Sequence, residues 1–268
     1  MTAKSGEIRV GIGGWTFEPW RGVFYPDGLK QKDELAYASR HLTAIEINGT
    51  YYSTFRPDSW RKWRDETPDG FVFTVKGSRF TTNRRELASA GPSLERFFAQ
   101  GMSELGDRLG PVFWQLPHTK RFDEADLDAF LALLPKSLDD RPLRNALEPR
   151  HASFCTPAYP ALLRKHGVAN VYARHATYPE IADLTADFVY ARLQTGEDAI
   201  PTAYPADELD AWAGRFATWA EGGAPEGLPI VDPSHAPAKT PRDVFAFIIH
   251  EGKVRAPAAA MALIERCA

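Results

Sequence analysis

The sequence has very little cysteine and no long apolar run. Its 268 residues include two cysteines, Cys155 and Cys267, and no C-x-x-C spacing. This excludes a disulfide framework, a zinc ribbon and a thioredoxin-type motif. No segment approaches the roughly 20 apolar residues of a membrane helix, and residues 1–7 lack the apolar run of a secretory signal. The sequence therefore predicts a cytoplasmic protein with no membrane partner.

An excess of charge of either sign is also missing. Lys and Arg total 32 and Asp and Glu total 35, which gives a formal net charge of −3. The overall charge thus gives no reason to expect bulk attraction to nucleic acid or anionic membranes. Any affinity for anions has to come from local clustering of basic residues.

Several motifs that bind cofactors are absent. Residues 11–14 read G-I-G-G, which is not the G-x-G-x-x-G of a dinucleotide site, and there is neither a Walker A sequence nor a G-x-S-x-G elbow. The seven histidines show no compact zinc-binding spacing. We therefore predict no cofactor and no metal ion.

What is present is a regular alternation of short apolar segments with longer amphipathic ones. The short segments are rich in Val, Ile, Phe or Tyr and bounded by Gly, Pro, Asn or Asp, which is typical of strands. They are residues 8–13, 43–48, 71–76, 111–116, 144–150, 169–174, 188–193 and 244–249. Helices are expected at residues 33–41, 58–66, 92–105, 123–134, 157–166, 207–221 and 257–266.

This alternation predicts parallel βαβ units. Eight such units fit a closed (β/α)8 barrel of the TIM type, an α/β fold, as one domain over residues 1–268. A doubly wound open sheet is the alternative. We expect irregularity around strands six to eight, because residues 175–187 are too few for a full crossover helix. The link over residues 194–242 is long, and extra structure is expected near residues 225–241.

Polar residues fall at the ends of the expected strands. Because successive strand residues alternate between faces, Glu46 shares a face with Asn48, and Glu148 shares one with Arg150. If the apolar face packs on the helices, these polar groups point into the barrel at its carboxyl mouth, where such barrels hold their active sites. The same reasoning adds Lys76, Gln115, Arg174, Arg192 and His250 to the candidate site.

The candidate site contains more cations than carboxylates. Lys76, Arg150, Arg174 and Arg192 stand against two glutamates, an excess of two positive charges. Such a mouth should attract anions. The alternative is an internal ion-pair network in which the glutamates merely neutralise the basic groups.

The loops after the expected strands are basic and aromatic. Residues 76–85 hold four cations and no acid. After the last strand, Lys253 and Arg255 precede a helix, an arrangement that often holds phosphate in barrels; an ordinary solvated loop is the alternative. Basic and aromatic groups together suit nucleotides, sugars or single strands. Trp15 and Tyr52 are therefore expected at the mouth, whereas Phe17, Phe24 and Tyr25 are expected to form a small core of their own.

Seven short motifs occur in a specific order along the chain. They are GIGGW (11–15), FYP (24–26), AIEINGTYY (44–52), FTVK (73–76), FWQLP (113–117), EPRHASF (148–154) and YARL (190–193). Together they resemble the YecE-like family, known as domain of unknown function 72, over about residues 8–264. The resemblance implies a TIM-type barrel and no established activity. A relation to barrel endonucleases rests on shape alone.

The matching positions include the candidate site residues. They are Trp15, Glu46, Asn48, Tyr52, Lys76, Gln115, Glu148, Arg150, His151, Ser153 and Arg192. This chain departs from the family pattern at Gln194-Thr195, where His-Gly is usual, and at His250, where Asn is common. If either position is catalytic in the family, the chemistry here is altered.

The function expected from these observations is a hydrolase that acts on a phosphorylated ligand, either a small anionic molecule such as a nucleotide or sugar phosphate, or nucleic acid. Lys76, Arg150 and Arg192 would hold the anion. Glu46, Glu148 or His151 would be the acid or base, although a loop hydrogen bond is the alternative role of His151. A non-catalytic binding protein is the second hypothesis, and a glycoside hydrolase that uses both glutamates is the third.

Overall fold

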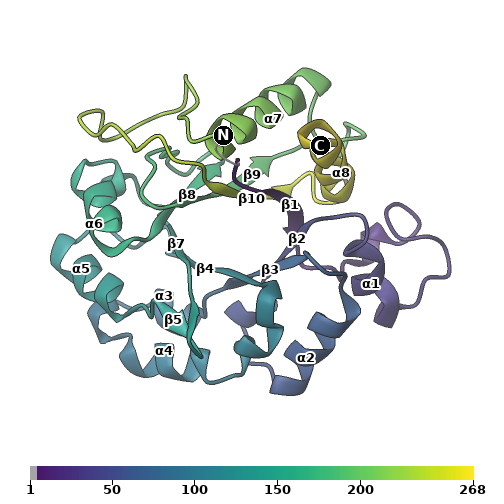
Figure 1. Ribbon diagram of the computed structural model, residues 1–268, viewed down its shortest axis with the longest axis horizontal. Helices are drawn as coiled ribbons and strands as arrows, with labels where there is room; N and C mark the ends of the chain where they lie inside the picture. The colour runs from purple at the N-terminus through teal and green to yellow at the C-terminus, as the bar shows by residue number, and fades with distance from the viewer. Residues whose placement is uncertain (1–4) are drawn as a thin grey trace.

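The computed structural model describes residues 5–268, which form a closed barrel of eight parallel strands (Figure 1). The predicted α/β TIM-type barrel is confirmed, and each of the eight expected segments forms one barrel strand. The first strand pairs with the last, Ile8 opposite Val244. In order around the barrel the strands are β1 (Ile8–Gly13), β10 (Asp243–Glu251), β9 (Phe188–Thr195), β8 (Ala169–Arg174), β7 (Asn145–Glu148), β4 (Leu109–Gln115), β3 (Val72–Lys76) and β2 (Ala44–Ile47).

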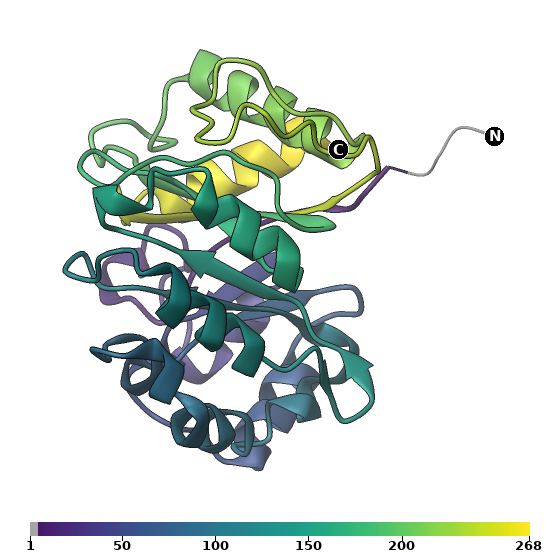
Figure 2. The same cartoon turned by 90° about the vertical axis from the view of Figure 1, so that its left-hand side faces the viewer.

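Helices surround the barrel and cover the outer face of its strands (Figure 1, Figure 2). Asp123 begins one of them as an N-cap, because its carboxylate accepts a hydrogen bond from the Asp126 main-chain N–H at 3.0 Å. None of the helices in residues 5–268 combines the length and apolar character needed to cross a membrane. They are α1 (Glu34–Ala38), α2 (Pro57–Glu66), α3 (Arg79–Thr82), α4 (Gly91–Phe98), α5 (Glu124–Leu133), α6 (Ala158–His166), α7 (Ala206–Ala220) and α8 (Ala256–Cys267).

Two expected helices are shorter than predicted. The segment at 33–41 yields only the five residues of α1. The segment at 92–105 divides into α4, which ends at Phe98, and a 3₁₀ segment, Met102–Arg108. Gly101 lies between them with a φ of 89°, a left-handed conformation that ends an α-helix.

Two links between strands are irregular. Residues 175–187 join β8 to β9 without a helix, as their length predicts. In the described chain residues 223–241 also contain no helix or strand, so the extra structure expected there is not a regular element. A two-stranded hairpin, β5 (Ser137–Leu138) and β6 (Arg141–Pro142), precedes β7. It was not predicted, because strands of two residues have no periodicity to detect.

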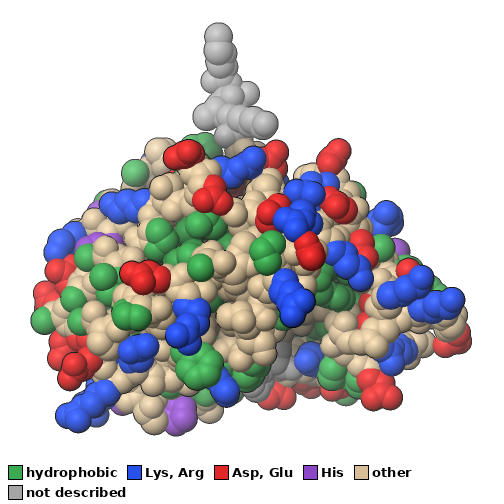
Figure 3. Space-filling view, turned by 90° about the horizontal axis from the view of Figure 1, so that it is seen from below, with side chains coloured by type: hydrophobic (Ala, Val, Ile, Leu, Met, Phe, Trp, Pro, Cys, Tyr) green, Lys and Arg blue, Asp and Glu red, His purple; other side chains and the backbone are tan. Residues whose placement is uncertain are grey.

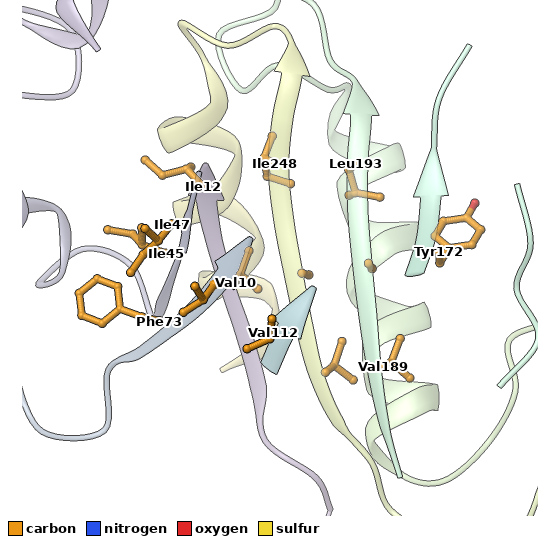
Figure 4. Close-up of a cluster of buried hydrophobic side chains, with 14 of the residues drawn as sticks. Val10, Ile12, Ile45, Ile47, Phe73, Val112, Tyr172, Val189, Leu193 and Ile248 are labelled. Atoms are coloured by element: carbon orange, nitrogen blue, oxygen red, sulfur yellow. The ribbon is translucent and has the colours of Figure 1, made fainter. Parts of the chain in front are cut away.

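The strand side chains form two apolar layers. Inside the barrel, Phe113 stacks on Tyr190 with ring centroids 5.3 Å apart, and Tyr190 also contacts Phe247 at 5.2 Å. Because these rings fill the barrel, polar groups gather above them at the carboxyl ends of the strands. The outer layer faces the helices (Figure 4) and includes Val10, Ile12, Ile45, Ile47, Phe73, Val112, Val189, Leu193 and Ile248.

Gly77 directly follows β3 and lies against the Trp114 ring. A Cβ atom at Gly77 would be 2.1 Å from Trp114 Cε3. Trp114 is fully buried and donates a hydrogen bond from Nε1 to Asn145 Oδ1 at 3.0 Å, so the ring cannot move freely. We expect Gly77→Ala to lower the free energy of unfolding by about 1–3 kcal/mol. Urea denaturation followed by circular dichroism measures this change.

Gly91→Ala is the matched control for this prediction. Nothing lies within 4 Å of a Cβ atom at Gly91, which is also the first residue of α4. This substitution should be neutral or slightly stabilising. Equal stabilities of the two variants would contradict the proposed clash with Trp114.

Candidate functional site

A buried arginine joins two glutamates across the barrel mouth. Arg192 of β9 donates to Glu46 of β2 from Nε at 3.0 Å and from Nη2 at 3.1 Å. Its Nη1 donates to Glu148 of β7. Glu46 and Glu148 are fully buried, and Arg192 is 4% exposed. We call these three residues the Arg192 network. The network links β2, β7 and β9 just above the apolar side chains that fill the barrel.

Other donors complete the hydrogen bonding of both carboxylates. Glu46 accepts from Asn48 Nδ2 at 3.0 Å and from the Tyr190 hydroxyl at 2.8 Å. Glu148 accepts from Gln115 Nε2 at 2.8 Å and from Arg150 Nε at 2.7 Å.

The protonation state of Glu148 follows from these neighbours. Burial by itself raises the pKa of Glu148, but the charges of Arg192 and Arg150 outweigh burial and lower the pKa to about 2. Glu148 is therefore ionised at neutral pH and has no proton to donate. Of the two roles expected for Glu148, acid or base, this arrangement favours the unprotonated one.

Lys76 is the cation of the mouth without a counter-charge in contact. Its ammonium lies 4.7 Å from the centroid of the Tyr51 ring and 5.5 Å from that of Phe113. Within residues 5–268 it makes no ion pair and no side-chain hydrogen bond. Burial lowers the pKa of Lys76 to about 8, and the charge of Arg192 adds to this effect. Lys76 is thus mostly charged at pH 7 and titrates just above it.

Arg150 is the second cation that solvent reaches. Its guanidinium stacks 4.5 Å from the Tyr178 ring centroid, and 17% of its side chain is exposed. Only its Nε is engaged by Glu148, so the terminal nitrogens of the guanidinium remain available within the described chain. Lys76, Arg150 and Arg192 face two carboxylates, which leaves one positive charge in excess and not the two expected.

Gln194 lies on the same face of β9 as Arg192. It is 1% exposed, and its Nε2 has no hydrogen-bond partner in the part of the chain that the structure describes. A buried amide nitrogen without a partner is uncommon and costs free energy. This position is one of the two at which the sequence departs from the family pattern.

Arg174 does not face the mouth, which corrects the prediction. The inner residues of β8 are Ala169 and Val171, so Arg174 points outward and pairs with Glu180 at 2.7 Å. Tyr172 likewise packs in the outer layer beside Trp212 (Figure 4). Helix α7 covers this face of β8, and Glu180 in the loop over residues 175–187 gives the outward Arg174 a charged partner.

Trp15 and Lys253 also lie away from the network. The Trp15 ring contacts Trp63 at 5.2 Å and Phe73 at 6.2 Å, so it belongs to the outer layer. The Lys253 ammonium lies 4.1 Å from the Phe17 ring centroid. Both side chains therefore pack against aromatic residues and not in the mouth. Phe17, Phe24 and Tyr25 contact Trp20 as a group of aromatic rings, but they join the main outer layer and do not form the separate core that was expected.

His151 adopts the loop role. Its Nδ1 accepts a hydrogen bond from the Ser153 main-chain N–H at 3.1 Å, and this bond caps the short turn Ala152–Phe154. The same Nδ1 lies 2.8 Å from the Ser153 hydroxyl. Tyr52 is 62% exposed, and its ring packs edge-on against that of Tyr51 with centroids 4.9 Å apart. The backbone of His250 lies in β10, but its side chain is outside the described residues.

Sequence reasoning missed several residues of the site. Strand alternation places Tyr190 on the inward face of β9 with Arg192, but only the closed barrel shows that its hydroxyl donates to Glu46. Thr74 contacts the Tyr190 hydroxyl at 2.9 Å. Tyr178 gives no such signal, because it lies in the irregular loop after β8.

Comparison with known proteins places this architecture. A family model described as "Protein of unknown function DUF72" matches residues 9–268. The UPF0759 protein YecE of Escherichia coli K12 is 29% identical over 150 residues, which are 55% of this chain and 50% of YecE. The chain thus spans about half the length of the curated relatives that it matches.

Two solved structures are similar over nearly their whole length. A DUF72 family protein of Thermotoga maritima MSB8 superposes with a TM-score of 0.68 at 22% identity, covering 96% of this chain and 97% of that one. A DUF72 family protein of Enterococcus faecalis V583 gives a TM-score of 0.70 at 14% identity, covering 97% and 95%. At these identities the structures share a fold.

Proposed function

This chain belongs to the DUF72 family of proteins of unknown function, so its activity has to be argued from its own mouth, and we propose that it hydrolyses a small phosphorylated ligand bound there. The observation that carries the proposal is the Lys76 ammonium, which is partly buried and makes no ion pair within residues 5–268. It lies beside Arg150, whose terminal nitrogens are available.

The cations of the mouth suit a phosphate group. Arg150 offers a planar fork of N–H donors, and Lys76 offers a point charge with three donors. The Arg192 network supports this pair, because Glu148 fixes the Arg150 guanidinium through its Nε at 2.7 Å. One positive charge in excess remains for an anion to neutralise.

Lys76 is the group in this site that we propose transfers a proton. With a pKa of about 8, it can donate a proton to the oxygen that leaves phosphorus and regain one from the water that attacks. Water oxygen forms the new bond to phosphorus, and the ester P–O bond breaks. Glu46 and Glu148 hold Arg192 in this scheme and transfer no proton.

A binding protein without turnover is the second candidate. The observation that favours it is the complete pairing of both glutamates, which leaves no carboxylate of the network free to act as a base. A glycoside hydrolase is less consistent with the site. One carboxyl of its catalytic pair has to carry a proton at the start of the reaction, whereas the pKa of Glu148 is about 2 and Glu46 is bonded to Arg192.

Titration with inorganic phosphate tests the proposed site. We expect Lys76→Met to weaken phosphate binding at pH 7 at least about tenfold, because a charge-assisted hydrogen bond is lost. Lys253→Met is the matched control, since Lys253 also places its ammonium over an aromatic ring but lies outside the mouth. Isothermal titration calorimetry measures both. Equal loss in the two variants, or none in Lys76→Met, would refute the site.

Turnover of 4-nitrophenyl phosphate separates the two candidate functions. Lys76→Arg should keep phosphate binding but lose turnover, because a guanidinium does not give up its proton near neutral pH. A wild-type protein that binds phosphate but releases no nitrophenol would support the binding protein instead.

A further inference from the structure

A cavity of about 530 Å³ opens beside the mouth, between α4 and the loops that follow β2 and β3. Its wall contains Arg84 and Arg96 together with five serine and threonine side chains, and no Asp or Glu. On the face of the molecule that carries α2 and α4, Lys and Arg side chains are otherwise interspersed with Asp and Glu (Figure 3). An acid-free wall is therefore a local feature of this cavity.

The two arginines of this wall have no acidic partner. Arg84 donates only to neutral acceptors, the main-chain oxygens of Phe80 at 2.8 Å and Ser89 at 3.3 Å and the Ser89 hydroxyl at 3.4 Å. Arg96 is exposed and makes no ion pair or side-chain hydrogen bond within residues 5–268. Their positive charges are thus free to meet an anion, and arginine with hydroxyl groups is a common donor set for phosphate.

Aromatic rings form the rim of the same cavity. Tyr52 is 62% exposed and Phe80 is 63% exposed, although both are large and apolar. The Arg79 guanidinium lies 5.7 Å from the Tyr52 ring centroid and 5.3 Å from that of Phe80. These planar groups offer stacking surfaces to a flat ring from a ligand.

We propose that this cavity binds a nucleotide, with its phosphate against Arg84 and Arg96 and its base against Tyr52 or Phe80. Each half of the arrangement matches one half of that ligand: cations and hydroxyls line the wall, and exposed rings line the rim. The site is distinct from the mouth, because neither Lys76 nor the Arg192 network lines it. The proposal therefore stands or falls independently of the hydrolase.

Calorimetric titration with adenosine 5′-monophosphate tests the proposal. Stacking accepts any base, so this nucleotide is a fair probe for the class. We expect Arg96→Gln and Phe80→Ala each to weaken binding at least about tenfold. Both side chains are exposed, so folding should survive, and thermal denaturation verifies this. Adenosine and inorganic phosphate, which each satisfy half of the site, should bind at least about tenfold more weakly.

Two control variants locate the bound nucleotide. Arg40→Gln removes an exposed arginine just after α1 that also donates only to a main-chain oxygen within residues 5–268, and it should leave binding unchanged. Because the mouth is itself proposed to bind phosphate through Lys76, these titrations are made in the Lys76→Met protein, so that only the cavity is measured. In the Lys76→Met protein, absence of nucleotide binding, phosphate binding as tight as that of the nucleotide, or unchanged binding on adding Arg96→Gln would each overturn the proposal.

Discussion

Replacing Arg192 with Met is expected to lower the free energy of unfolding by about 3–5 kcal/mol at pH 7. Two fully buried carboxylates, Glu46 and Glu148, would lose their shared guanidinium, and burial of an unpaired charge is costly. Urea denaturation measures the loss. Arg141→Met is the control, because the Arg141–Asp107 pair is exposed and should contribute less than about 1 kcal/mol.

The pH dependence of this loss has a definite sign. The folded pKa of Glu148 is lowered to about 2, so its contribution to stability is present above the unfolded value and disappears as the pH falls toward 2. The gap between wild type and Arg192→Met should therefore shrink on acidification. A gap that stays constant from pH 7 to pH 3 would contradict the role assigned to the carboxylates.

A combined variant separates charge from packing. Replacing Glu46 and Glu148 with Gln in the Arg192→Met protein removes the unpaired charges and leaves the side-chain volumes similar. Part of the lost stability should return, because a neutral set in place of a buried ion-pair network is often tolerated. If the combined variant is less stable than Arg192→Met alone, then shape and hydrogen bonding, rather than charge, determine the stability of the mouth.

Lys76→Met is expected to stabilise the fold while it weakens phosphate binding. The pKa of Lys76 falls from 10.5 to about 8 on folding, so the charged amine is less stable in the folded protein than in the unfolded chain. Methionine removes that penalty, which we put at about 1–2 kcal/mol because the side chain keeps some contact with water. Thermal and urea denaturation at pH 7 measure the gain.

The sign of the Lys76 effect can be followed with pH. Below pH 8 the amine is charged in both states, and its penalty is present in full. Between about pH 8 and 10.5 the folded protein loses the proton first, so the penalty disappears and wild type should approach Lys76→Met in stability. Lys30→Met, at an exposed position, is the control and should show no such trend. Destabilisation by Lys76→Met at pH 7 would contradict the prediction.

Strand alternation accounts for the part of the site that the sequence predicts. Glu46, Glu148 and Arg192 each lie at the inward end of a strand whose apolar face packs on helices, and this information is local. The pairing of one guanidinium with both carboxylates is not local information, because Glu46 and Arg192 are 146 residues apart in the sequence. The pairing depends on barrel closure, which no short window of sequence encodes.

The failed placements share a physical reason. Arg174 was assigned by alternation on the assumption that polar residues face inward, but on the outer face of β8, beside α7, it finds a carboxylate partner in Glu180. Trp15 and Lys253 lie in loops, where no periodicity fixes the direction of a side chain. Alternation shows which residues share a face, but the partners available on each side decide which face points into the barrel.

The pairing of β1 with β10 has a consequence for translation. A ribosome that has released β1 must still make the more than 200 residues that separate Ile8 from Val244 before the two strands can meet. Until then the nascent chain is an open sheet with two unpaired edges, which invite aggregation. Glu46 and Glu148 also emerge before Arg192, so both stay hydrated until β9 arrives. We therefore expect closure of the barrel and burial of these charged side chains to come at the end of chain synthesis.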